Sequence, residues 1–203
     1  MPLKAVVFDA FGTLVYIQDR RSPFRRLIRW SEEHGRARQV EDGERIMSTA
    51  LDLRGAAAAL GLTPPEELLA QWERDLQHEL TAIRVYPEAR DLIVELQKAG
   101  YRVALCSNLA APYGPPVRTL LPTLDAYAMS YEVGAVKPQP RIYQFLLDHL
   151  GLAAGEVLFI GDTAIADQDG PRAVGMQACL LDRSTGQSLS AVVQSTLSLS
   201  DER

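Results

Sequence analysis

The stretch LKAVVFD at residues 3–9 is a short apolar run, rich in β-branched residues, that ends abruptly in a carboxylate. Three similar runs follow it: YRVALCSN (101–108), EVLFIGD (156–162) and QACLLD (177–182). None of them alternates apolar with polar residues, so each predicts a strand that is buried on both faces of a parallel sheet. The stretch AYAMSYEV (126–133) is a weaker candidate for a fifth strand.

Helical patterns separate these strands. The stretch PEARDLIVELQKAG (87–100) begins with Pro and ends at Gly, and PRIYQFLLDHLG (140–151) has the same start and stop residues. A short helix is expected over GPRAVGM (170–176), leading into the last strand. Strands that alternate with helices predict an α/β fold, built on a doubly wound parallel sheet.

One long segment, residues 15–84, breaks this alternation. Its patterns are helical throughout, and no strand is expected in it. The second of its three expected helices covers residues 43–61, and the third follows Thr63. We therefore expect an α/β core formed by residues 1–14 and 85–203, and a small all-helical cap domain formed by residues 15–84.

Composition narrows the possible partners. The chain has 203 residues, 47% of them hydrophobic and 23% charged, which is ordinary for a globular protein. A net charge of -5 provides no general attraction to nucleic acid or to an anionic membrane. No apolar run approaches the roughly 20 residues of a membrane helix, and the N-terminal run is too short for a signal peptide. Cys106 and Cys179 lie in apolar runs, which predicts buried free thiols and a cytoplasmic location.

Polar residues gather where the expected strands end. Open α/β sheets bind their ligands beyond the carboxyl ends of the strands. The residues at or just after these ends are Asp9, Ser107, Asn108, Asp162 and Asp167, with Lys137 in the loop VGAVKP. Charged groups beside a buried sheet are costly unless they are paired or bound to a metal, which favours a catalytic site. Helix capping is the alternative interpretation of any single one of these positions.

Four of these stretches occur in a familiar order. The segments FDAFGTLV (8–15), LCSN (105–108), VGAVKP (133–138) and FIGDTAIADQDGPRAVGM (159–176) resemble the four motifs of the haloacid dehalogenase-like (HAD) superfamily. The helical insertion after the first strand resembles the cap of that family. The resemblance implies a hydrolase whose cap closes over a small anionic substrate rather than over a nucleic acid.

The resemblance also implies roles for the residues of the first three motifs. Asp9 would be the nucleophile and would form an aspartyl intermediate. Backbone N–H groups of the turn after Asp9, together with Ser107, would hold the transferring phosphoryl group, and Lys137 would act on it as a point charge. The substrate contacts implied in these motifs are Phe11, Gly12, Thr13 and Asn108.

A magnesium site is implied by the first and last motifs. Asp9, Asp162 and the backbone carbonyl of Phe11 would hold Mg²⁺, and Asp167 would be a direct or indirect ligand. Magnesium favours a few hard oxygen ligands, which this set supplies.

Phe11 departs from the phosphatase pattern, in which a second aspartate two positions after the nucleophile transfers protons. Phenylalanine cannot do so. Three interpretations stay open: a magnesium-dependent phosphohydrolase, a metal-independent 2-haloacid dehalogenase, or a catalytically weakened binding protein. Dehalogenases of the family resemble the chain in having an aromatic residue there, but they typically replace the first aspartate of the last motif. Because Asp162 and Asp167 are kept, we favour the phosphohydrolase.

The arginine-rich stretch DRRSPFRRLIRW (19–30) lies at the entrance to the expected cap. Arg20 and Arg21 precede the first cap helix and are the candidates for substrate binding; we expect one of them to contact an anionic substrate. The alternative is an ordinary solvated face balanced by nearby glutamates. Tyr16 and Asp19, in the same linker, are candidates to replace the missing acid.

Overall fold

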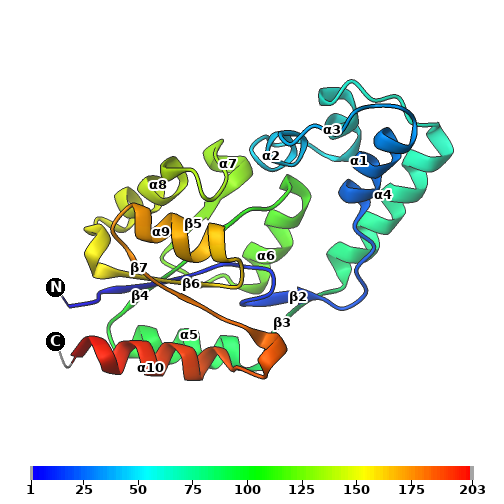
Figure 1. Cartoon of the computed structure of the whole chain (residues 1–203). Helices are drawn as coiled ribbons and strands as arrows, with labels where there is room; N and C mark the ends of the chain where they lie inside the picture. Colours follow the sequence, from blue (N-terminus) through cyan, green and yellow to red (C-terminus); the bar gives the residue numbers. More distant parts are fainter. Residues whose placement is uncertain (1, 202–203) are drawn as a thin grey trace.

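The computed structural model describes residues 2–201, with side chains for residues 2–197. Its centre is a five-stranded sheet in the order β5-β4-β1-β6-β7, and every pair of neighbours is parallel (Figure 1). The strands are β1 (Ala5–Phe8), β4 (Arg102–Ser107), β5 (Ala126–Met129), β6 (Val157–Gly161) and β7 (Gln177–Leu180). The expected α/β core with a parallel sheet is confirmed.

The central strand β1 places the nucleophile candidate. Ala5 pairs with Arg102 of β4 on one side and with Val157 of β6 on the other, and the register continues without a bulge. Since all the strands run the same way, their carboxyl ends meet at one edge of the sheet. The first polar residues beyond β1, β4 and β6 therefore become neighbours.

Helices cover both faces of the sheet. The helices α5 (Pro87–Lys98) and α10 (Leu189–Asp201) lie on one face, and α8 (Pro140–Leu150) and α9 (Gly170–Ala173) lie on the other (Figure 1). Successive side chains of β1 point to opposite faces. Phe8 accordingly packs in the cluster that contains Leu92 and Val193, whereas Val7 packs with Leu146 and Phe159. This arrangement is the doubly wound sheet that the alternation predicts.

Two expected elements are wrong in extent. Within AYAMSYEV only Ala126–Met129 is strand, and the second half forms the short helix α7 (Ser130–Val133). Ser130 begins this helix, and its hydroxyl accepts a hydrogen bond from the N–H of Leu109 at 3.1 Å. The helix expected over GPRAVGM covers only α9, and a π-helical turn (Ala164–Asp169) precedes it.

The inserted segment begins and ends with strands, which corrects the expectation of none. Strands β2 (Val15–Ile17) and β3 (Ile83–Val85) pair antiparallel, with Tyr16 opposite Arg84. They are the two chain segments that connect the core with the inserted helices. Three residues are too few to show a strand period, so the sequence pattern could not reveal them.

Four helices form a separate body beyond the carboxyl ends of the sheet strands (Figure 1). They are α1 (Pro23–Glu33), α2 (Asp42–Met47), α3 (Leu53–Ala59) and α4 (Glu66–Thr81). The single helix expected over 43–61 is wrong, because Asp52 accepts a hydrogen bond from the N–H of Gly55 at 2.6 Å and starts a new helix.

The helical body has its own apolar core, built around Leu27, Trp72 and Leu76, and it meets the α/β core through Ala110. We propose that residues 15–84 act as a cap on a core of residues 1–14 and 85–203, and we call them the cap and the core below.

The remaining part of the core holds α6 (Gly114–Leu120), which follows β4. Both cysteines are free thiols, Cys106 buried and Cys179 half-buried. Within residues 2–201, no helix combines the length and the apolar character needed to cross a membrane.

Candidate active site

The loop after β1 holds Asp9 at the carboxyl edge of the sheet. The N–H of Asp9 still follows the sheet and donates to the carbonyl of Ile160 at 3.0 Å. The chain then turns sharply, since the N–H groups of Leu14 and Val15 both donate to the carbonyl of Ala10 at 2.9 Å. This tight turn keeps the nearly buried Asp9 side chain at the edge where the strands end.

Gly12 is required in this turn for two reasons. Its φ of 88° lies in the left-handed region, which residues with a side chain rarely adopt. A Cβ atom at this position would also collide with the carboxylate of Asp162. The glycine therefore lets the end of β6 approach the loop that carries the nucleophile candidate.

Arg183 stabilises the loop after β1 by binding two of its backbone carbonyls. Its guanidinium donates to the carbonyl of Gly12 at 2.9 Å and to that of Thr13 at 2.6 Å, and it also pairs with Glu88 at 2.8 Å. No sequence pattern predicts this contact, because Arg183 lies about 170 positions from Gly12 and Thr13. Thr13 itself is fully buried.

Lys137 ties the two buried aspartates together. Its Nζ donates to Asp9 Oδ1 at 2.7 Å, to Asp167 Oδ1 at 2.6 Å and to the carbonyl of Cys106 at 2.9 Å. Only 2% of the lysine side chain is exposed, so its ammonium has exchanged water for these three acceptors. Burial opposes the charge, but the carboxylates of Asp9 and Asp167 outweigh it and raise the pKa of Lys137. The lysine therefore stays charged and restrains Asp9.

Asn108 positions the loop that carries this lysine. Its amide nitrogen donates to the carbonyl of Lys137 at 2.8 Å, and its amide oxygen accepts from the N–H of Lys137 at 2.7 Å. The structure thus shows Asn108 as a bridge between two loops, and it also borders the pocket described below. Ser107 is the last residue of β4 and is 1% exposed, at the same edge as Asp9.

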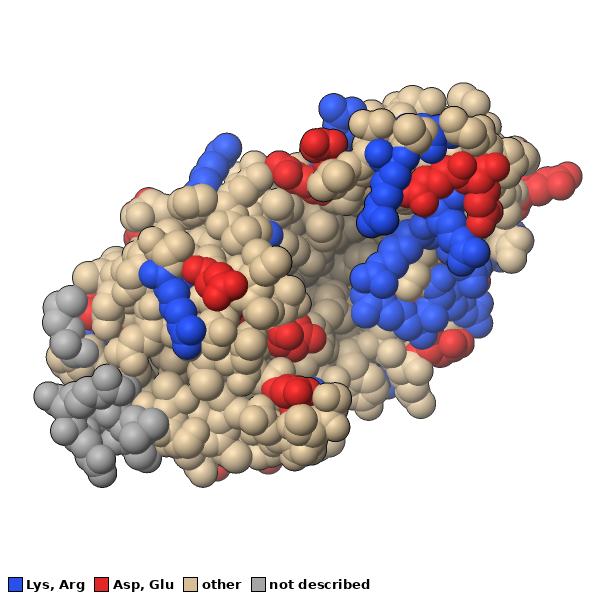
Figure 2. Space-filling view, in the orientation of Figure 1, with Lys and Arg blue, Asp and Glu red and all other residues tan. Residues whose placement is uncertain are grey.

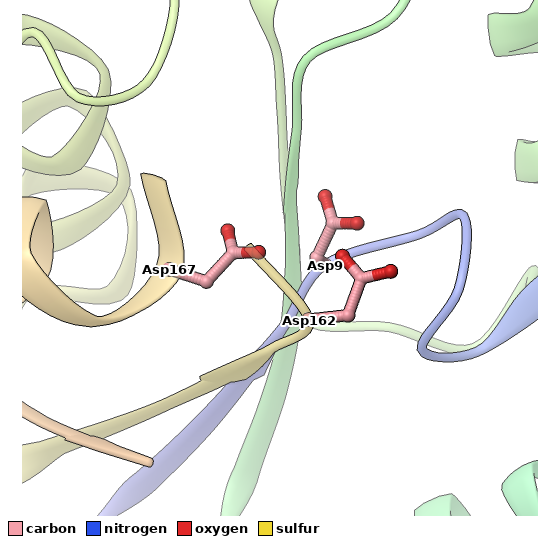
Figure 3. A group of neighbouring side chains, drawn as sticks. All are labelled: Asp9, Asp162 and Asp167. Carbon is pink, nitrogen blue, oxygen red and sulfur yellow. The ribbon is translucent and has the colours of Figure 1, made fainter. Parts of the chain in front are cut away.

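Three carboxylates converge on one point at this edge (Figure 3). An oxygen from each of Asp9, Asp162 and Asp167 lies within 4.8 Å of the others. Asp9 and Asp162 follow β1 and β6, and Asp167 projects from the π-helical turn. The N–H of Thr163 holds Asp167 by donating to its Oδ2 at 2.9 Å. Gly161 leaves room for it, because a Cβ there would collide with the Asp167 side chain.

The negative charges of these three aspartates repel one another. Burial and the charge of Asp9 raise the pKa of Asp162 above its ordinary value. Burial raises the pKa of Asp167 as well, and the charge of Asp9 adds to this, against the opposing effect of Lys137. Asp162 has no ion-pair partner within residues 2–197, and Lys137 supplies one ammonium for three carboxylates. This oxygen-rich set, with its uncompensated charge, fits a hard divalent cation.

Phe11 occupies the place where the phosphatase pattern has its second aspartate. Its ring is half-buried and packs edge-on against Tyr113, with ring centroids 5.8 Å apart. The side chain therefore forms an apolar wall toward the cap. Its backbone carbonyl as a metal ligand stays a prediction.

A pocket of about 360 Å³ separates this wall from the cap. The core contributes Phe11, Asn108 and Tyr113 to its lining, and the cap contributes Arg20, Arg25 and Glu79 together with several apolar side chains. Figure 2 shows a hollow between the two parts of the molecule, with Lys and Arg side chains gathered on the cap beside it.

The structure separates the two arginines that the sequence singled out. Arg20 lines the pocket, whereas the guanidinium of Arg21 is engaged by Asp75 at 2.8 Å and Asp19 at 3.3 Å and does not line it. Asp19, which also contacts His78, is likewise absent from the pocket lining, as is Tyr16. Asp19 is engaged by Arg21 and His78, and the Tyr16 ring packs against Tyr86, so a role for either residue in place of the missing acid stays a prediction.

Glu79 is a site residue that the sequence did not reveal. It is 1% exposed, although it lies on a cap helix with a largely polar composition. Its carboxylate accepts hydrogen bonds from the backbone N–H groups of Arg21 and Ser22 and from the Tyr113 hydroxyl, the last two at 2.5 Å. It thereby holds Ser22 at a φ of 54°, a left-handed conformation that is costly for a serine. Glu79 thus connects the linker, the cap and the core.

Comparisons with known proteins agree with this architecture. The family profile described as haloacid dehalogenase-like hydrolase matches residues 3–175. A phosphatase of Mycobacterium tuberculosis is 30% identical, covering 98% of this chain and 96% of its own. The (S)-2-haloacid dehalogenase 1 of a Pseudomonas species is 29% identical, covering 90% of this chain and 86% of its own.

A solved structure gives the same fold. It is a HAD family enzyme from Bacteroides thetaiotaomicron in complex with magnesium and inorganic phosphate. It is 18% identical with a TM-score of 0.66, and the match covers 93% of this chain and 98% of that one.

Proposed function

The chain belongs to the haloacid dehalogenase-like hydrolases, and we propose that within them it is a magnesium-dependent phosphomonoesterase of a small anionic metabolite. The observation that carries the proposal is Asp162. This partly exposed carboxylate lies within 4.8 Å of Asp9 and Asp167 and has no ion-pair partner within residues 2–197. A dehalogenation site that uses no metal has no need of such a charge. Free thiols favour the cytoplasm as the location.

The residues fit a magnesium ion. Asp9, Asp162 and Asp167 would supply hard carboxylate oxygens, and the Phe11 carbonyl is the further ligand that we propose. When bound, the cation would offset the repulsion between the carboxylate nucleophile and an anionic substrate.

Asp9 is the proposed nucleophile. Because Lys137 holds Oδ1 at 2.7 Å, the other oxygen of the carboxylate is the one left to attack phosphorus. The new bond joins Asp9 to phosphorus as the bond from phosphorus to the leaving oxygen breaks. Lys137, the Ser107 hydroxyl and the N–H groups of the turn after Asp9 would stabilise the charge on the transferring group. Water then attacks phosphorus, which releases phosphate and restores Asp9.

Phe11 limits both steps, because it can neither protonate a leaving group nor activate water. Substrates with acidic leaving groups need no protonation and should react best. The attack of water in the second step still lacks a general base, whatever the leaving group. We therefore expect the aspartyl phosphate to persist longer than in an enzyme with a carboxylate at this position.

Dehalogenation is the second candidate. It is favoured by Phe11, since a halide leaves without a proton, and by the similarity to the Pseudomonas enzyme. Arg20 beside a largely apolar pocket is compatible with it as well. The charge at Asp162 argues against it.

The test is turnover of p-nitrophenyl phosphate with and without Mg²⁺, by the wild-type chain and by Asp9→Asn. We expect magnesium-dependent release of phosphate that Asp9→Asn abolishes. Chloride released from 2-chloropropionate without added metal, and no phosphate release under either condition, would overturn the proposal in favour of the second candidate.

A further inference from the structure

The pocket between cap and core is lined mostly by apolar side chains, together with two arginines and one glutamate. Most of its wall is apolar, with Phe24, Ile28 and Met47 on the cap side and Phe11 and Leu109 on the core side. Its volume of about 360 Å³ is near the lower end of the range for small-molecule sites. Such a wall gains from burying an apolar body and offers a sugar few hydrogen-bond partners.

Two guanidinium groups border the same space without a partner. Arg20 and Arg25 both line the pocket, and neither side chain makes a hydrogen bond or an ion pair with any residue from 2 to 197. Both are exposed, so each can reorient toward a ligand.

The neighbouring arginines differ, because their charges are already matched. Arg21 and Arg26 share the two oxygens of Asp75, at 2.8 Å and 2.7 Å, and Arg29 pairs with Glu33 at 2.8 Å. Among the five arginines of residues 19–30, the two without a partner in residues 2–197 are therefore the two that line the pocket.

The acidic group in the lining does not neutralise this pair. Glu79 accepts three hydrogen bonds, from Arg21, Ser22 and Tyr113, which occupy both of its oxygens. The lining keeps a net positive charge next to an apolar wall, at the end of the pocket formed by the cap.

We infer that the substrate is a phosphomonoester whose leaving group has an apolar body and a second anionic group, a carboxylate, that Arg20 and Arg25 bind. This inference rests on the proposed function, and it adds the chemical class of the leaving group. A guanidinium presents paired N–H donors that match the two oxygens of a carboxylate. The phosphoryl group lies at Asp9, the apolar body crosses the pocket past Phe11, and the carboxylate reaches the cap.

Two matched esters test the inference: 4-carboxyphenyl phosphate and its neutral analogue, 4-carbamoylphenyl phosphate. They have nearly the same shape and differ in the charge of one group. We expect kcat/KM to favour the carboxylate ester by roughly tenfold or more, the size of a charge-assisted hydrogen bond. The preference should fall toward one in Arg20→Met and Arg25→Met, and further in the double variant.

Arg29→Met is the matched control, because Arg29 lies on α1 like Arg25 but pairs with Glu33 in solvent. It should keep the preference of the wild-type chain. Equal kcat/KM for the two esters, or a preference that the double variant retains, would overturn the inference.

A binding measurement separates this inference from the proposed function. Calorimetric titration with 4-hydroxybenzoate and 4-hydroxybenzamide, the two product phenols, needs no turnover. If no ester is hydrolysed but the benzoate binds more tightly than the amide, and Arg20→Met removes the difference, the pocket assignment stands and the phosphatase fails. If the two phenols bind equally or not at all, the pocket assignment fails whatever the turnover.

Discussion

The buried charged residues of the core site have fixed partners, whereas the two pocket-lining arginines of the cap have none within residues 2–197. In the core, Lys137 is almost fully buried and shares its three donors among Asp9, Asp167 and a backbone carbonyl. On the cap, Arg20 and Arg25 are exposed and have no partner within residues 2–197. A buried pair with fixed partners can orient a reacting group, whereas an unpaired exposed guanidinium is free to bind an anionic group of the substrate.

The difference indicates a division of labour. The core holds its groups in one geometry, as the proposed chemistry requires, and it does so at a cost in buried charge. The cap leaves its two pocket-lining cations without partners in the described part of the chain, as the proposed binding of a carboxylate requires. Substitutions in the core site should therefore affect turnover rate and stability together, and substitutions of Arg20 and Arg25 should affect the choice of substrate.

The largest effect is expected from Lys137→Met. It leaves the carboxylates of Asp9 and Asp167 buried without their ammonium, and removing one partner of a buried ion pair costs about 3–5 kcal/mol. We expect a loss of this size in the free energy of unfolding, and turnover below detection. Urea titration of this variant and of Lys98→Met, an exposed lysine on α5, measures it. Equal losses in the two variants would break the comparison.

Phe11→Asp tests whether the missing general acid limits turnover. The new carboxylate can protonate a leaving group, so hydrolysis of an alkyl phosphate should rise by roughly 10²-fold or more relative to p-nitrophenyl phosphate. Phe11→Asn is the control, because it also removes the contact with Tyr113 but cannot transfer a proton. The idea fails if both variants change the two rates alike.

How far the sequence leads can be seen from these same residues. Asp9 and Asp162 are predictable, because each ends an apolar run that forms a parallel strand. Lys137 is noticed as a charged residue in a loop, but its pairing with Asp9 follows only from the resemblance to a family, since 128 positions separate the two residues and no local pattern links them. Glu79, Tyr113 and Arg183 escape prediction because their partners come together only in the folded chain.

Glu79→Gln tests the connection between cap and core. Glutamine keeps the shape and one acceptor oxygen, but it loses the charge that strengthens the three hydrogen bonds. We expect a cost of about 1–2 kcal/mol in the free energy of unfolding. Glu73→Gln on the same helix is the control. Its partner Arg54 is exposed, so the cost there should stay below about 0.5 kcal/mol. Equal costs would show that Glu79 contributes no more than a surface ion pair.

The smallest effect concerns Asp162 without metal. Its pKa in the folded chain is raised above the ordinary value of 3.8, so its charge opposes folding at neutral pH. That cost disappears as the pH falls through the raised pKa toward 3.8, because the folded chain then takes up the proton. In a chelator at pH 7, Asp162→Asn should therefore melt higher than the wild-type chain, by about 2 °C, and the gap should close in acid.

With magnesium, the wild-type chain should melt higher than Asp162→Asn, since an ion that binds the folded chain stabilises it. The wild-type chain should gain in Tm and Asp162→Asn should not. Asp91→Asn, an exposed position on α5, controls for the loss of one charge. A magnesium-induced gain that Asp162→Asn retains would contradict the proposed ligand set.

The central claim is that Asp9 attacks phosphorus, and the most direct test is to find the phosphoryl group on it. The wild-type chain would be mixed with p-nitrophenyl phosphate and Mg²⁺, quenched in acid within the first turnovers, and digested for mass spectrometry. Because Phe11 leaves the second step without a base, the account predicts that the peptide containing Asp9 carries one phosphoryl group, and that chelation of the metal prevents it. Phosphate released at steady state with that peptide unmodified at every quench time would contradict the account.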